Sequence, residues 1–400
     1  MMRIAKLFTH EPVPPACSGH PRGLELTRPR RLRRGRQSYA VSQILPHVAS
    51  VLAAGVLLAA HVASGAVIWD GNDDGDNPAD NNWSTGDNWD GGSEPSSTDD
   101  AEITNGDTVS VTNSGELADS LVLDASTVTQ TGGSLGFGLR YDENGANGQR
   151  GLFLSISDGG RYELSGGTLN NNDGNAFAAD ARIGDDGEGT LLIDGGDFGE
   201  DNNGEIDDVI VGRGTDGDGL LRIESGSFYA HHANADLRVG AGDGTGRIEV
   251  VGSTPDAIQV GADFQIESST SSLAFEIDSG GVTPISIGHR GNPILDLNGT
   301  LDISLSEAPP SADIPLIVLQ KSASSTSGAF TNYPSEGDEV SVFFDAQYYI
   351  WDLTYAGGTS GDDVILQNLR TEIPEPGSLA ALVLAGGALL RRRRRFPTRG

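Results

Sequence analysis

The sequence predicts an all-β protein, a right-handed parallel β-helix (β-solenoid), and three observations support this fold class. A repeat of 27 to 30 residues runs through the middle of the chain, and apolar and polar residues alternate inside each copy. No stretch between residues 67 and 372 carries the sustained apolar stripe of an amphipathic helix. With 56 glycines among 400 residues and only 6% aromatic residues, the composition is that of many short strands joined by tight turns.

The repeat is visible in two markers. The first is a glycine followed by alternating apolar residues, and its copies begin at Gly160, Gly189, Gly219 and Gly246, which are 29, 30 and 27 residues apart. The second is an aliphatic residue before glycine, at residues 183–184, 211–212 and 239–240, with spacings of 28 and 28. A degenerate earlier copy covers residues 128–135. A period shared by two markers favours stacked coils over antiparallel hairpins in a sandwich, which is the alternative fold.

The alternation predicts which side chains face the interior. One strand-turn-strand unit cannot bury its apolar face alone, but stacked units bury a continuous column. The predicted interior rows are Tyr162, Leu191, Leu221 and Ile248, and then Leu164, Ile193, Ile223 and Val250. The outward positions Arg161, Thr190, Leu220 and Arg247 are too mixed in chemistry for the flat, regular row of an ice-binding or carbohydrate-binding face.

The N-terminal segment, residues 1–66, reads as a secretory leader. A basic stretch at residues 28–36 precedes an apolar run at 48–60, and small residues stand three and one positions before a cleavage point at Val67. A helix retained in the membrane is the alternative, although the apolar run is short for stable spanning. The only cysteine, Cys17, lies in this leader, so the mature chain is predicted to have no disulfide and no thiolate site.

The C-terminal segment, residues 373–400, has the order of a temporary membrane anchor. A Pro-stiffened motif, Pro374-Glu375-Pro376, precedes an apolar run at residues 379–390 that is shorter than the ~20 residues of a comfortable span. A positive block that stays cytoplasmic follows. The leucines expected to form the membrane segment are Leu379, Leu382, Leu384, Leu389 and Leu390, and the stop-transfer block is Arg391, Arg392, Arg393, Arg394 and Arg395.

This order strongly resembles the PEP-CTERM sorting signal of Gram-negative-type bacteria. The resemblance implies processing near Pro374-Glu375-Pro376 by an exosortase, a membrane peptidase, during export to the cell surface or an exopolysaccharide matrix. It covers only the tail and departs from the pattern in the extra residues 396–400. Helical segments are expected only in the signal peptide and in this anchor.

Two further resemblances concern the ends of the body. Trp69, Trp83, Trp89 and the polar residues around them resemble the module that opens the β-helix of bacterial surface proteins, where tryptophans cover the first coil. Residues 349–366 resemble the closing strands of autotransporter-type passenger repeats. The expected organisation is a leader (1–66), a solenoid body with an irregular Trp-rich cap (67–305), a closing β region (306–372) and the sorting signal (373–400).

Charge restricts the partners. Outside the leader and the tail, the chain has 54 acidic and 11 basic residues, so it repels nucleic acid and anionic lipid and attracts divalent cations. Calcium is the one cofactor considered. Asp70, Asn72, Asp74 and Asp76 match the alternating oxygen ligands of a calcium loop, but the twelfth position is Asn81 instead of the bidentate glutamate. These residues are also ordinary turn formers.

Further acids lie in the predicted turns, at Asp185-Asp186, Asp216, Asp218 and Asp243. Stacked coils would align them, and the like charges would then bind cations or splay into solvent, with solvated turns favoured. No nucleophile elbow, phosphate loop or zinc motif appears. The main histidine candidates for chemistry are His231-His232 and His289, and the tandem pair is expected to be exposed in a loop.

The favoured function is therefore a non-catalytic exported protein with a structural or adhesive role at the cell surface or in the exopolysaccharide matrix. Its expected partners are the processing exosortase, extracellular polysaccharide and, transiently, the inner membrane. The alternative is a secreted polysaccharide lyase or hydrolase on the same scaffold, in which outward residues such as Arg222 and Arg247 would line a groove.

Overall fold

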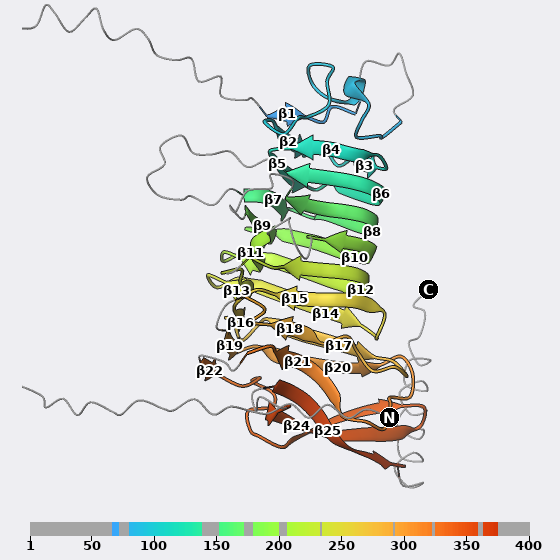
Figure 1. Ribbon diagram of the computed structural model, residues 1–400, viewed down its shortest axis with the longest axis vertical. Coiled ribbons are helices and arrows are strands. Elements are labelled where there is room, and N and C mark those ends of the chain that lie inside the picture. Colours follow the sequence, from blue (N-terminus) through green and yellow to red (C-terminus); the bar gives the residue numbers. More distant parts are fainter. Residues whose placement is uncertain are drawn as a thin grey trace, which may run out of the picture. The chain divides into compact units, whose positions relative to one another are not determined.

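The computed structural model describes residues 66–71, 80–137, 152–171, 179–199, 206–232, 234–290, 293–321, 325–358 and 363–374. The chain divides into two compact units, residues 1–61 and 62–400, and every described residue belongs to the second. The described residues form strands and one 3-10 turn, η1 (Gly86–Asn88). They build an all-β solenoid whose coils stack in a single column (Figure 1).

One wall of the solenoid is a ten-stranded sheet in which every pairing is parallel. Its strands, in order, are β1 (Val67–Ile68), β2 (Asp100–Ile103), β5 (Ser120–Asp124), β7 (Leu152–Ser157), β9 (Ala179–Asp185), β11 (Ile206–Arg213), β13 (Leu237–Ala241), β16 (Phe264–Ile266), β19 (Ile294–Leu297) and β22 (Ser325–Ser327).

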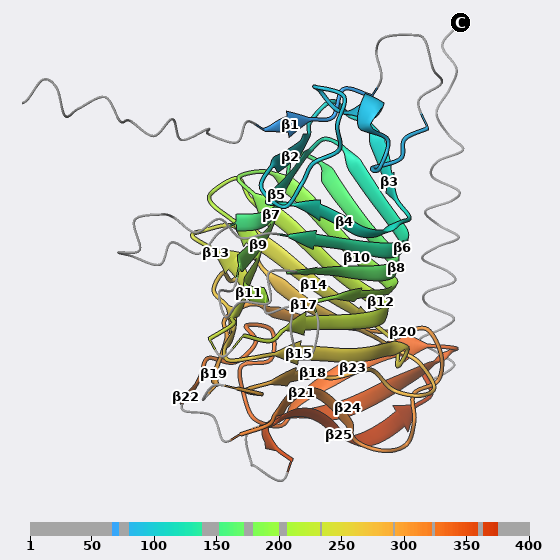
Figure 2. The ribbon, with the colours of Figure 1, turned by 45° about the horizontal axis from the view of Figure 1, so that its top comes forward.

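The second sheet has fifteen strands and covers the rest of the coil. Figure 2 shows its long strands side by side as one broad face, with β7, β9 and β11 along the flank. Its strands are β3 (Thr108–Val111), β4 (Ser114–Ala118), β6 (Thr127–Phe137), β8 (Gly160–Asn171), β10 (Glu188–Phe198), β12 (Asp218–Ala230), β14 (Thr245–Val251), β15 (Pro255–Val260), β17 (Ser272–Ile277), β18 (Ile285–Ile287), β20 (Thr300–Leu305), β21 (Ile314–Leu319), β23 (Asp338–Phe344), β24 (Gln347–Gly357) and β25 (Asp363–Glu372).

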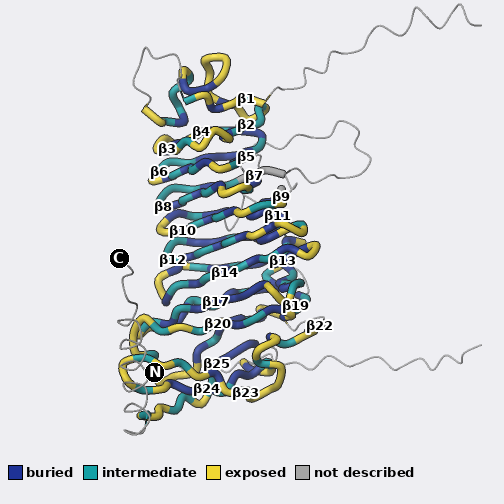
Figure 3. The backbone as a smooth tube through the Cα atoms, turned by 180° about the vertical axis from the view of Figure 1, so that it is seen from behind, coloured by how far each residue is buried: buried dark blue, intermediate teal, exposed yellow. Residues whose placement is uncertain are grey.

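The register confirms the predicted interior rows and excludes the antiparallel sandwich. Leu191 lies between Tyr162 on β8 and Leu221 on β12, and Leu221 in turn pairs with Ile248 on β14. The second row and the outward row align in the same way, and all eight predicted interior residues are at most 1% exposed. Buried and partly exposed residues therefore alternate along the strands, while exposed residues gather at the turns and ends (Figure 3).

Each coil turns a corner inside the fifteen-stranded sheet. The first part of β12, through Ile223, pairs with β14, whereas its second part, from Gly226 onward, pairs with β15. Gly226 sits at the corner with φ +78°, and a Cβ there would lie 2.0 Å from the Gly196 carbonyl oxygen of the neighbouring coil. Only glycine fits this combination of left-handed backbone and close approach, which explains the glycines inside the strand repeat.

The second marker has a similar cause. Gly184, Gly212 and Gly240 end the aliphatic part of β9, β11 and β13, with φ of +74°, +73° and +75°. At Gly212 a Cβ would lie 1.9 Å from the Thr245 carbonyl oxygen, so a bend against the next coil requires glycine here. The spacing of this marker in the sequence is thus the length of one coil measured between equivalent bends.

Tyr162 and Gln130 form a hydrogen-bonded chain inside the solenoid. The buried Tyr162 hydroxyl donates to Gln130 Oε1 at 2.6 Å, and Gln130 Nε2 donates to the Thr168 carbonyl oxygen at 2.9 Å. Burial raises the pKa of Tyr162, so the hydroxyl stays protonated. Further along the same sheet, Phe198 and Phe228 stack with ring centroids 5.2 Å apart and planes 3° apart.

The two ends of the described region differ from the coils between them. Before the first coils, Trp89 packs edge-on against Trp69 and Trp83, at centroid distances of 5.1 and 4.8 Å. At the other end, β21 pairs antiparallel with β25, and β24 pairs antiparallel with both β25 and β23. Parallel pairing continues as far as β22, so coils extend beyond Leu305 into the region where closing strands were expected.

Candidate functional site

The structure describes few of the residues that the sequence assigns to sorting. Pro374 is the last described residue of the tail, and Glu375, Pro376, the five leucines and the five arginines lie outside the described residues, as does the leader up to residue 65. Within the described part of the chain, no helix is long and apolar enough to cross a membrane. The signal peptide, the anchor and the processing motif therefore stay predictions from the sequence.

The predicted calcium loop is also described only in part. Asp70 is described and its N–H donates to the Asn88 carbonyl oxygen at 3.1 Å, but Asn72, Asp74 and Asp76 lie outside the described residues. Among the described residues, no group of three or more His, Cys, Asp or Glu side chains is placed to hold a metal ion. Structural calcium at this loop stays a prediction.

The predicted acidic turns do stack along one edge of the column. The Asp186 N–H donates to the Arg213 carbonyl oxygen at 3.0 Å, and the Gly214 N–H donates to the Ala241 carbonyl oxygen at 3.0 Å. Asp185, however, neither splays outward nor faces only other acids. Its carboxylate accepts from Arg182 Nη1 at 3.1 Å and from Arg213 Nη1, one coil away, at 3.2 Å.

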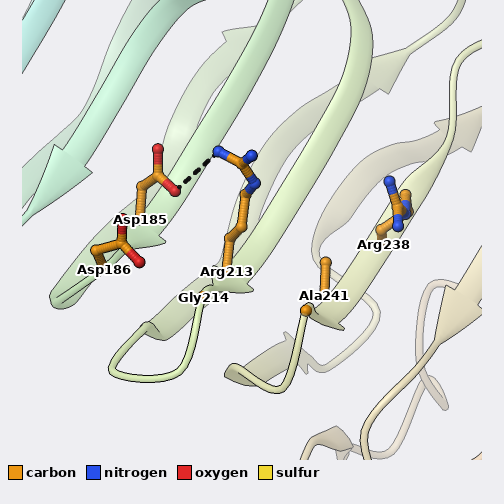
Figure 4. Close-up of a pocket in the computed structure, with 7 residues that line it drawn as sticks. Asp185, Asp186, Arg213, Gly214, Arg238 and Ala241 are labelled. Carbon is orange, nitrogen blue, oxygen red and sulfur yellow. Dashed lines mark hydrogen bonds and ion pairs between the residues drawn. The ribbon is translucent and has the colours of Figure 1, made fainter.

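These turns enclose an open depression of about 390 Å³, here called the turn depression (Figure 4). Its walls carry two acids and two arginines on neighbouring coils, so it offers both donors and acceptors at short range. Figure 4 shows the Asp185 carboxylate directed toward the Arg213 guanidinium across the depression. The lining residues are Asp185, Asp186, Arg213, Gly214, Arg238, Ala241 and Gly242.

A second polar feature, the aspartate column, comprises Asp180, Asp208, Asp236 and Asp263, which lie near the starts of four strands of the ten-stranded sheet. Asp208 Oδ1 accepts from the Asp236 N–H at 3.1 Å, and Asp236 Oδ1 accepts from the Asp263 N–H at 3.3 Å. Asp263 Oδ1 accepts from the Ile294 N–H at 2.8 Å. Each carboxylate thus binds the backbone of the next coil, and Asp180 precedes Ala181, the register partner of Val209, one coil earlier.

The central acid of this column, Asp236, has a strongly perturbed pKa. Burial and the charges of Asp208, Asp263 and Asp207 raise the pKa of Asp236 to about 7. The neighbouring cation Arg238 is already paired through Nε with Glu267 Oε1 at 2.6 Å. A carboxyl that titrates near neutrality beside other carboxylates is the kind of group that acid-base catalysis uses.

Sequence reasoning missed the aspartate column, although a signal for it exists. Three of its members stand three residues before the aliphatic residue of the second marker, and the fourth stands three residues before Ile266. The column therefore repeats at intervals of 28, 28 and 27 residues: Asp180, Asp208, Asp236 and Asp263. The repeat of a charged residue at a coil-equivalent position predicts a ladder of side chains along the sheet.

The outward arginines of the fifteen-stranded sheet are held in ion pairs. Arg247 contacts Glu249 at 2.6 Å and Asp302 at 2.7 Å, and Arg222 contacts both Glu224 and Glu249. Burial opposes the ionisation of Glu249, but its bonds to Arg247 and Arg222 outweigh burial and lower the pKa of this carboxyl. The two arginines expected to line a groove therefore cross-link coils, Arg222 to the next coil and Arg247 to the second coil on.

The expectation of exposed histidines was wrong for His231. This side chain is only 7% exposed and packs edge-on against His289, with ring centroids 5.3 Å apart. His232 Nδ1 lies 3.2 Å from Asp207 Oδ1, beside the aspartate column. The contact with His289 joins residues 58 positions apart, so the local sequence around residue 231 could not reveal it.

Comparison of this chain with protein-family models, curated proteins and solved structures finds no match in any of the three.

Proposed function

We propose that the chain is an exported protein with a structural or adhesive role at the cell surface or in an exopolysaccharide matrix. Its body would be a right-handed parallel β-helix, opened by a cap of Trp69, Trp83 and Trp89 and closed by β23–β25. The C-terminal signal at residues 373–400 would anchor it briefly in the inner membrane, where an exosortase would process it near Pro374-Glu375-Pro376.

The observation that carries this proposal is the use of surface arginines as coil-to-coil ties. Arg213 bonds Asp185 on the preceding coil, Arg222 bonds Glu249 on the following coil, and Arg247 reaches Asp302 two coils on. Pairs of this kind contribute little each, but repeated along stacked coils they resist bending and shear. Among the described residues, ion pairs hold Arg161, Arg182, Arg213, Arg222, Arg238, Arg247 and Arg370, and the excess of acids leaves an acidic surface.

Retention in the matrix tests the proposal. The gene would be deleted from its host and restored either complete or with residues 373–400 removed, and the protein would be measured in cell, matrix and medium fractions. The proposal expects the complete protein in the matrix fraction and the truncated one elsewhere, with loss of cell cohesion in the deletion strain. An unchanged location of the truncated protein would contradict the sorting role.

A secreted polysaccharide lyase or hydrolase is the second candidate, and Asp236 is the observation that favours it. This carboxyl, with a pKa of about 7, has Asp208 and Arg238 as neighbours, and Arg238 also lines the turn depression. The test is release of reducing ends or unsaturated products from host exopolysaccharide by the purified protein. Activity that disappears in Asp236→Asn would establish this function. Absence of any product would leave the structural role as the remaining candidate.

A further inference from the structure

The closing strands end in three exposed apolar residues, here called the apolar corner: the paired Phe343 and Tyr348, and Ile373, which follows Glu372, the register partner of Tyr348. Their exposed fractions are 53%, 40% and 80%, and they are three of the four large hydrophobic residues exposed in the described chain. Phe343 on β23 pairs directly with Tyr348 on β24, and their rings lie 5.1 Å apart. Clustered exposed apolar residues at one end of a domain mark an interaction surface.

The strand register places the corner where the chain leaves the solenoid. Tyr348 pairs with Glu372 at the end of β25, and Ile373 and Pro374 follow. Leu379, the start of the apolar run, comes five positions after Pro374, and a segment of that length spans at most about 17 Å. If that run is inserted in a bilayer, the corner lies within reach of the bilayer surface.

We propose that the apolar corner rests in the interfacial layer of a phospholipid bilayer while the C-terminal run is inserted, and so orients the solenoid on the membrane. This inference rests on the membrane anchoring in the proposed function. Tyrosine favours the headgroup level because its ring is apolar and its hydroxyl is polar, and the ring of Phe343 adds apolar area beside it.

Charge favours this occupant over a second copy of the chain. A second solenoid would bring another surface with a large excess of acids against the first. Four residues further along the same face of the hairpin, Arg370 binds Glu339 at 2.7 Å and Asp352 at 2.8 Å, which neutralises part of the charge of that face. Glu372 stays beside Tyr348, so a zwitterionic headgroup layer fits this surface better than an anionic one.

The chain's own apolar tail is a less suitable occupant. A proline ring fixes the φ of its own residue and favours an extended conformation for the residue before it. Pro374 and Pro376 both stand in the short segment between β25 and the apolar run, so this segment is biased toward an extended path. Folding residues 379–390 back onto the corner would require a reversal within the segment that contains both prolines.

Site-specific labelling of the full chain tests the inference. With Cys17→Ser as background, an environment-sensitive fluorophore is placed at Ser341→Cys, an exposed position two residues from Phe343 on the same face of β23. Glu188→Cys, an exposed strand position midway along the solenoid, is the matched control. The proteins are reconstituted into phosphatidylcholine vesicles with or without brominated acyl chains, and flotation is measured on the same samples.

The expected result is flotation with the vesicles, a blue shift and bromine quenching at position 341, and neither effect at position 188. The double variant Phe343→Ser/Tyr348→Ser should still float but lose the shift and the quenching. Flotation with an unresponsive label at 341 would overturn the inference and leave the anchoring intact. Failure to float would overturn both, and a blue shift without vesicles would assign the corner to a second copy or to the tail.

Discussion

At the scale of single residues, Asp236 shows the electrostatic cost of repeating one acidic residue in successive coils. Strands of neighbouring coils are ~4.8 Å apart, so a repeated aspartate places like charges at that spacing. Asp208, Asp236 and Asp263 offset part of this repulsion because each carboxylate accepts a backbone N–H of the next coil. The middle acid has charged neighbours on both sides, which together with burial accounts for its raised pKa.

The raised pKa of Asp236 predicts that the free energy of unfolding depends on pH. The pKa of Asp236 is about 7 in the folded chain and ~3.9 when unfolded, so the folded state binds the extra proton between these values. Its stabilising contribution is complete below pH ~4 and is lost as the pH rises through 7. After allowance for solvent screening, we expect Asp236→Asn to raise the free energy of unfolding by roughly 1–2 kcal/mol at pH 8 and to have little effect at pH 4.5.

Urea unfolding between pH 4.5 and 8 measures this difference. The asparagine retains an oxygen that can accept the Asp263 N–H, so only the charge changes. Asp186→Asn, which removes one negative charge from an exposed turn aspartate, is the control for the loss of charge itself. A wild-type slope that persists in Asp236→Asn would assign the pH dependence to the acidic surface as a whole.

At the scale of structural elements, the glycine corners decide how a coil closes. Gly226→Ala would combine a φ of +78° with a Cβ 2.0 Å from the Gly196 oxygen, so we expect a loss of roughly 2 kcal/mol or more in the free energy of unfolding. Gly115→Ala is the matched control, because Gly115 has φ +88° with open space around its Cβ position; it should cost about 1 kcal/mol. Equal losses in chemical denaturation would mean that close approach between coils is unimportant.

The tryptophan cluster makes a second prediction at this scale. Trp89 is 1% exposed, packs against two other tryptophans and donates through Nε1 to the Trp83 carbonyl oxygen at 2.7 Å. Trp89→Ala should cost roughly 3–5 kcal/mol locally, and because each coil contacts mainly its neighbours, the loss should be greatest in the first coils. Hydrogen exchange should therefore accelerate in β2 and β5 and remain unchanged in β24 and β25. Uniform acceleration would show that the coils unfold as one unit.

At the scale of the whole solenoid, the sequence predicted the fold because two periods determine which side chains are buried, the alternation along a strand and the length of a coil. Alternation sets which side chains point inward, and the coil length sets which residues become neighbours, so the row from Tyr162 to Ile248 followed from the sequence. The continuation of parallel coils to β22 was missed because the markers degenerate after Gly246. Burial of His231 was missed because it depends on His289, a partner distant in sequence.

The proposed function depends on the two ends of the chain more than on any single side chain of the body. Surface arginines tie coils together, and the corner at Phe343 and Tyr348 lies beside the exit to the tail. Both features give the solenoid a role only if the leader and the sorting signal direct export and anchoring. Maturation at these ends is therefore the central claim.

Intact mass and fractionation of the protein from its native host test that claim most directly, with and without alteration of Pro374-Glu375-Pro376 to alanines. We expect a species outside the cell that begins near Val67 and ends near the Pro-Glu-Pro motif, and we expect this species to be lost in the altered strain. A chain that keeps residues 379–400 and remains in the inner membrane in both strains would contradict release to the surface and make this a permanently tethered envelope protein.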